Sequence, residues 1–151
     1  MASSDADRVR FSPPSGEWGG PIPVADLDSQ GYWNNIRDHK LTIQRCVACR
    51  KWVHPPLAAC DHCQTFNLQF EPVSGHGTVY SYTIVNREFT PGILPPYVVA
   101  LVDLDDADAR LVSNIVNVAS EDLHIGMKVE VIFHDITPTA ALALFQPRGN
   151  G

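Results

Sequence analysis

The sequence predicts a mainly β protein, in which an N-terminal helix and a rubredoxin-like four-Cys zinc ribbon are followed by a five-stranded OB-fold barrel. Three observations lead to this fold class. All four cysteines of the 151-residue chain lie in two Cys-x-x-Cys pairs. A helical pattern of apolar residues precedes them, and short alternating strands follow them. We expect four parts: an extended Pro/Gly-rich arm over residues 1–25, a helix over 26–40, the zinc ribbon over 41–70 and the OB-fold over 71–147.

Composition excludes several classes of protein. With a net charge of -6 and 44% hydrophobic residues, the chain has the balance of one compact domain with a small appendage. An acidic total disfavours general binding to the phosphate backbone of nucleic acids. No apolar run approaches the roughly 20 residues that cross a bilayer, and Met1–Arg10 lacks the apolar core of a signal peptide. We therefore expect a cytoplasmic protein with reduced thiols, no nucleic-acid partner and no membrane contact.

The first segment is rich in Pro, Gly and Ser and cannot form a regular element alone. Three apolar residues nevertheless recur along it, namely Phe11, Trp18 and Ile22. Two outcomes remain open. Either the arm lies in a groove of its own domain or of a partner, or it moves freely.

A short helix is predicted from about Ser29 to His39, with Asp28 or Ser29 as its cap. The helical spacing is set by Leu27, Tyr32, Trp33 and Ile36. Because this apolar stripe is narrow, the helix must pack on this chain or on a partner.

The ribbon follows, and its metal ligands are predicted to be Cys46, Cys49, Cys60 and Cys63. Four protein ligands close a site, so the predicted cofactor is structural Zn²⁺. Iron in a rubredoxin-like site, or free or oxidised thiols, remain alternatives. His54 and His62 are taken as surface residues.

Arg50 and Gln64 occupy the positions after each second cysteine, where the tight turn commonly requires Gly. Strand-like alternation over 41–45 and over Phe66, Leu68 and Phe70 pairs the two ends of the ribbon.

Beyond Glu71 the pattern predicts an all-β barrel. Its strands are expected over 78–85, 97–104, 110–116, 128–134 and 140–145, with one helical turn at Ser120–Leu123. This order is that of an OB-fold. The long loop Glu88–Pro96 carries Phe89, Ile93 and Leu94, which we expect to contact a ligand or partner.

The sequence contains no recognisable catalytic motif, and we expect no catalytic residue. None of the six histidines (His39, His54, His62, His76, His124 and His134) has a partner acid or nucleophile at suggestive spacing. The acids Asp103, Asp105, Asp106 and Asp108 resemble a solvated hairpin tip more than a calcium loop. A basic cluster at the junction of helix and ribbon is a candidate contact for a CoA phosphate or a partner. It consists of Lys40, Arg45, Arg50 and Lys51.

The order of helix, ribbon and barrel resembles the zinc-ribbon OB-fold family once classed as a domain of unknown function and encoded beside thiolases and lipid-transfer-protein-like ketothiolases or aldolases. The resemblance covers Asp26 to Phe145. Besides the cysteine pairs it rests on Y-W-N-N-I-R-D-H-K-L-T-I-Q-R-C, P-V-S-G-H-G-T-V-Y-S-Y-T, P-Y-V-V-A-L-V-D-L and I-G-M-K-V-E-V-I-F. The missing knuckle glycines depart from the common family pattern.

The resemblance implies a non-catalytic accessory subunit that binds and completes a thiolase-fold or lipid-transfer-protein-like enzyme. That partner would perform retro-aldol or Claisen-type acyl transfer, with acyl-CoA at a shared site. Two other functions compete with this one. The first is an OB-fold nucleic-acid-binding module with Tyr80, Tyr82 and Tyr97 as stacking platforms. The second is a self-sufficient enzyme that uses a histidine.

Overall fold

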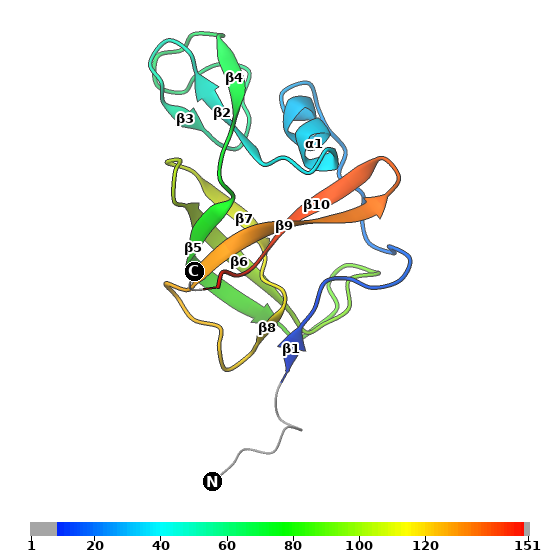
Figure 1. Ribbon diagram of the computed structural model, residues 1–151. Coiled ribbons are helices and arrows are strands. Elements are labelled where there is room, and N and C mark those ends of the chain that lie inside the picture. Colours follow the sequence, from blue (N-terminus) through cyan, green and yellow to red (C-terminus); the bar gives the residue numbers. More distant parts are fainter. Residues whose placement is uncertain (1–8, 150–151) are drawn as a thin grey trace.

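Three sheets and one helix make up residues 9–149, the part of the chain that the computed structural model describes. A small three-stranded sheet and the helix lie at one end, above a barrel of longer strands (Figure 1). This arrangement confirms the predicted fold class. In chain order the elements are β1 (Arg10–Phe11), α1 (Gln30–Arg37), β2 (Thr42–Cys46), β3 (Trp52–Val53), β4 (Leu68–Pro72), β5 (His76–Val85), β6 (Tyr97–Leu104), β7 (Arg110–Asn114), β8 (Val118–Ala119), β9 (Lys128–Thr137) and β10 (Ala140–Pro147).

The barrel is built from five antiparallel-paired strands in the order β10-β9-β5-β6-β7. Its two outer strands meet through a parallel bridge between Ile115 and Phe145, where the Val116 N–H donates to the Phe145 carbonyl at 2.8 Å. The register of β5 against β6 shifts at Tyr80, as in a β-bulge. This closure gives the partly open barrel that the strand order predicts.

The predicted helical turn at 120–123 is wrong. Residues 120–122 instead form a hydrogen-bonded turn, in which the Asp122 N–H donates to the Ala119 carbonyl at 3.0 Å. The physical reason is that the preceding residues, Val118 and Ala119, form β8 and pair with β1 of the arm.

Helix α1 begins and ends close to its predicted limits, and Ser29, one of the two predicted caps, is its N-cap residue. The Ser29 side chain caps no helical N–H and instead exchanges hydrogen bonds with Asp26 at 2.6 to 3.1 Å. At the other end His39 adopts a φ of 58° and its N–H donates to Ile36, while the Lys40 N–H donates to Asn35. These two bonds form a Schellman motif, which ends the helix.

One apolar core joins the helix, the ribbon and the barrel. Ile36 of α1 and Ile43 of β2 are buried in the same cluster as Val79, Val102 and Phe145. The helix packs on β10 and β2 of its own chain, so no partner is needed to bury its apolar stripe. A second, smaller cluster forms around Cys46, Val53 and Cys60.

The arm lies on its own barrel. Phe11 is only 2% exposed, and its carbonyl accepts from the Asn117 N–H at 2.7 Å. Trp18 is half-buried, whereas Ile22 is exposed. In the described residues, no helix has the length and apolar character to cross a membrane.

Candidate metal centre and contact surfaces

The four cysteines converge at the end of β2. Their Sγ atoms all lie within 4.8 Å of one another, with 3.5 Å between Cys46 and Cys63 and 3.6 Å between Cys49 and Cys60. Four thiolates at about 2.3 Å from a tetrahedral zinc ion lie about 3.8 Å apart. The donor set therefore fits zinc without rearrangement. With all four positions taken by protein sulfur, no position remains for water or substrate.

Local hydrogen bonds reach the thiols of Cys46, Cys60 and Cys63, and at Cys46 they favour the thiolate. The Cys49 N–H donates to the Cys46 Sγ, and the His62 N–H donates to the Cys60 Sγ, both at 3.4 Å. The Thr65 hydroxyl lies 3.2 Å from the Cys63 Sγ. The Cys49 N–H, followed by the Thr65 hydroxyl, lowers the pKa of Cys46 to about 6. This favours the thiolate, which is the form that binds metal.

Both metal-binding turns adopt the left-handed conformation although neither has Gly. Arg50 has a φ of 65° and Gln64 a φ of 64°. Their N–H groups donate to the carbonyls of Cys46 and Cys60 at 3.0 and 2.9 Å. The backbone therefore makes the turn that Gly normally makes, at a cost of roughly 1–2 kcal/mol for each non-Gly residue.

A buried glutamine supports the segment between the two turns. Gln44 of β2 is 5% exposed, and its side chain accepts from the Leu57 N–H at 2.8 Å and donates to the Leu57 carbonyl at 2.9 Å. Sequence reasoning missed this residue because a polar side chain in an alternating strand predicts the solvent face. The structure instead buries both faces of β2 at this point.

The predicted basic cluster is largely paired within the chain. Arg45 and Arg50 both bind Glu71, at 3.3 and 2.9 Å, and Lys51 binds Asp61 at 3.1 Å. Arg45 also covers the Trp52 ring at 4.3 Å. Lys40 makes no ion pair with the described residues. The four cations therefore do not form one free positive surface.

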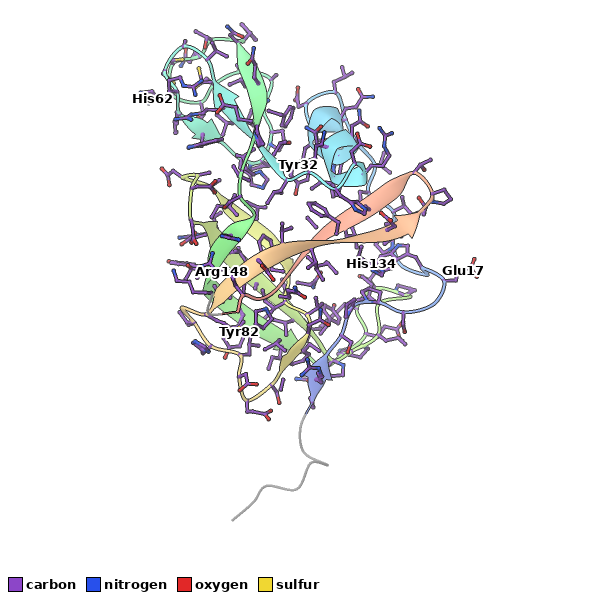
Figure 2. All side chains as sticks on the ribbon, in the orientation of Figure 1. Glu17, Tyr32, His62, Tyr82, His134 and Arg148 are labelled. Atoms are coloured by element: carbon purple, nitrogen blue, oxygen red, sulfur yellow. The ribbon has the colours of Figure 1, made fainter. Side chains whose placement is uncertain are left out.

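The assignment of His54 to the surface is wrong. Its ring packs 5.9 Å from Tyr32, and its Nδ1 is the one fully buried side-chain polar atom without a hydrogen-bond partner among the described residues. Burial lowers the pKa of His54. His62, in contrast, is exposed at the outer end of the ribbon (Figure 2).

The long loop between β5 and β6 exposes two apolar side chains. Phe89 is 71% exposed and Leu94 is 75% exposed, whereas Ile93 is half-buried. Ile93 and Leu94 both line a cavity. Their contact with a partner stays a prediction.

The three tyrosines proposed as stacking platforms have different surroundings. The Tyr80 ring is covered by Arg110 at 3.4 Å, and the Tyr82 hydroxyl donates to the Leu123 carbonyl at 3.4 Å. Tyr97 lines the same cavity as Ile93. They do not form one surface for stacked bases.

Of the four aspartates of the predicted hairpin tip, Asp103 lies in β6, and Asp105, Asp106 and Asp108 lie between β6 and β7. Asp103 pairs with Arg110 at 2.6 Å and Asp106 accepts from the Ser74 N–H at 2.9 Å. Within residues 9–149, only the four cysteines come close enough together to share a metal ion.

Two family models match the chain in succession. Residues 33–69 match the model described as "ChsH2, rubredoxin-like zinc ribbon domain", and residues 70–134 match "ChsH2, C-terminal OB-fold domain". Together with the thiol geometry, the first match confirms structural Zn²⁺ as the cofactor.

Several curated proteins are similar in sequence. A "Probable enoyl-CoA hydratase alpha subunit" of Thermomonospora curvata is 36% identical over 84% of this chain and 40% of the relative. A "3-oxo-4,17-pregnadiene-20-carboxyl-CoA hydratase alpha subunit" of Mycobacterium tuberculosis is 29% identical over 83% of this chain and 39% of the relative. The chain thus spans about two fifths of the length of these two relatives. A "DUF35 domain-containing scaffold protein" of Methanocaldococcus jannaschii is 34% identical over 69% of this chain and 75% of its own length.

Among solved structures, one chain of the "Ltp2-ChsH2(DUF35) aldolase" is similar with a TM-score of 0.77 and 36% identity. The match covers 83% of this chain and 98% of that chain. A DUF35-family protein of unknown function from Sulfolobus solfataricus, at 16% identity and a TM-score of 0.59, shares the fold.

Proposed function

Because this chain belongs to the DUF35 family, whose ChsH2-type members join a rubredoxin-like zinc ribbon to an OB-fold domain, we propose that it is a non-catalytic accessory subunit of an acyl-CoA enzyme. The partner that we propose is a thiolase-fold or lipid-transfer-protein-like subunit. That partner would perform retro-aldol cleavage or Claisen-type acyl transfer and would hold the catalytic residues.

The observation that carries the proposal is the closed metal site within a fully folded ribbon and barrel. Catalytic zinc keeps one coordination position open, whereas here four thiolates fill all four. The ion therefore stabilises the ribbon and does not activate water. Within the proposal, the metal site therefore supports the structure of this chain, and the chemistry belongs to the partner.

The names of the relatives support the choice of partner. One solved relative is a chain of an Ltp2-ChsH2(DUF35) aldolase, and another relative is named a scaffold protein. Within the proposal, Phe89 and Leu94 contact the enzyme subunit, since exposed apolar side chains on a loop are typical of contact surfaces. Lys40 is the basic side chain best placed to meet a CoA phosphate, because the neighbouring cations pair with carboxylates of this chain.

Co-purification tests the proposal. We expect the tagged 151-residue chain to retain a thiolase-fold enzyme through size-exclusion chromatography, and the complex to turn over an acyl-CoA that the chain alone leaves unchanged. A monodisperse monomer that neither binds such an enzyme nor alters its activity would contradict the proposal. Turnover by the chain alone, lost on substitution of one histidine, would favour the self-sufficient enzyme instead.

A matched pair of variants locates the contact. Phe89→Asp with Leu94→Asp places two charges on the loop and should weaken the complex at least tenfold. Val112→Asp places a charge on a similarly exposed apolar position, 72% exposed on β7, and should leave binding unchanged. An equal loss of enzyme binding in the loop variant and in Val112→Asp would show that the loop is not the contact.

A further inference from the structure

A partly enclosed cavity of about 270 Å³ lies where the arm crosses the barrel. One wall is the arm from Phe11 to Gly19, and a second is the loop from Gly92 to Val98. The floor is formed by the closing edge of the barrel, including Ile115 and Leu142. Four segments distant in sequence therefore surround one space beside the parallel bridge of the barrel.

The cavity has a mainly apolar lining, with Ser12, Ser15, Glu17, Tyr97 and Asn114 as its polar side chains. The side-chain amide of Asn114 donates to the Val98 carbonyl at 2.8 Å. The Glu17 side chain, at the rim, points outward from the arm (Figure 2). His54 Nδ1, the one fully buried unpartnered polar atom of the described side chains, belongs to another part of the molecule. A ligand needs no hydrogen-bonding group to fit here, and a buried charge would be costly.

Both outer walls are held by packing, which gives a ligand a way in. Between Phe11 and Asp26 the arm forms no backbone hydrogen bond with another described backbone group. Its Trp18 Nε1 donates only to Pro21 within the arm, at 3.1 Å. The arm and the loop touch at Gly19 and Gly92, where a Cβ on Gly92 would overlap the Gly19 carbonyl. The arm beyond Phe11 and the loop before Tyr97 can separate without breaking a strand pair, since the pairs of β1 with β8 and of β6 with β5 lie outside these segments.

We propose that this cavity binds an uncharged hydrocarbon group of about eight carbons. An apolar cavity of about 150 Å³ accepts benzene, so a cavity of 270 Å³ accepts a larger group. Identifying that group with the acyl portion of a substrate rests on the proposed function, whereas the binding itself does not.

Titration of the zinc-loaded chain with 1-octanol and 1-butanol tests the site. With methyl groups labelled for NMR, we expect saturable shifts at Ile93, Ile115 and Leu142, and at least tenfold tighter binding of 1-octanol. Absence of saturation, or shifts centred elsewhere, would overturn the proposal. Co-purification with an enzyme is a separate measurement, so either idea can fail without the other.

Substitutions that fill the cavity, one from the loop and one from the floor, provide the second test. Ile93→Trp on the loop and Leu142→Phe on β10 should each weaken 1-octanol binding at least tenfold. Val112→Trp adds the larger ring outside the cavity and should change binding less than twofold. Because the two substitutions lie on different segments, one variant still tests the site if the other does not fold. Wild-type affinity in a folded cavity variant would refute the site.

Discussion

Replacement of Gln44 by Met separates the hydrogen bonds of the ribbon from its packing. Methionine keeps a similar length and an apolar stem, but it can neither donate to the Leu57 carbonyl nor accept from the Leu57 N–H. The change therefore removes two hydrogen bonds from the segment that leads to Cys60.

The expected loss follows from the number of bonds. Each net hydrogen bond contributes about 0.5–1.5 kcal/mol, so two contribute about 1–3 kcal/mol to the free energy of unfolding. For a chain of this size, that corresponds to a fall in Tm of roughly 2–12 °C. Because structural zinc binding is coupled to folding, release of zinc to a chelator should also become faster.

Urea unfolding and zinc release to a chromogenic chelator measure the two effects. Gln69→Met is the matched control, since Gln69 is an exposed glutamine on β4 and its replacement should stay within about 0.5 kcal/mol. If Gln44→Met were as stable as Gln69→Met and released zinc at the wild-type rate, the supporting role of Gln44 would be refuted.

Three further predictions concern the ribbon. Cys60→Ser should lower the zinc content measured by atomic emission and unfold the ribbon, since metal affinity contributes folding free energy; full zinc content would show that the ligand set is wrong. Gln64→Gly should stabilise the protein by up to about 1 kcal/mol in thermal unfolding, because relief of the left-handed backbone strain outweighs the conformational entropy that Gly loses on folding. Gln64→Val should destabilise the protein. The opposite order of stability would show that Gln64 is not strained. Burial lowers the pKa of His54, so as pH falls through about 6.5 the unfolded state binds a proton first and stability declines until the folded pKa is passed. His54→Phe should flatten this decline in urea titrations between about pH 7.5 and 5.5, and an equally steep decline would count against the buried imidazole.

The fold class was predictable because its signals are local. Cysteine spacing alone indicated a four-thiolate site, and alternation indicated the barrel strands, of which Tyr97–Leu104 has the predicted limits. Pairing extends β5, β9 and β10 beyond their predicted limits, whereas β7 ends at Asn114, two residues before its predicted end. For example, β9 runs to Thr137 because it pairs with β10 beyond His134.

Features that depend on distant residues were not predictable. The pairing of β8 with β1 brings residues 118–119 to the arm and replaces the expected helical turn. The ion pairs of Arg45 and Arg50 with Glu71 join two strands of the ribbon, so the sequence showed the cations but not their neutralisation. The cavity beside Ile93 requires four segments that only the folded chain brings together.

The shared core limits how this chain can be divided or recombined. The family-model boundary between residues 69 and 70 falls inside β4, and α1 packs on β10 although most of the chain separates them. Exchanging residues 33–69 for those of another protein would remove Ile36 and Ile43 from the core that they share with the barrel. Ribbon and barrel therefore form one packed unit that also includes Phe11, and chimeras should be joined outside residues 10–147 rather than between the two matched models.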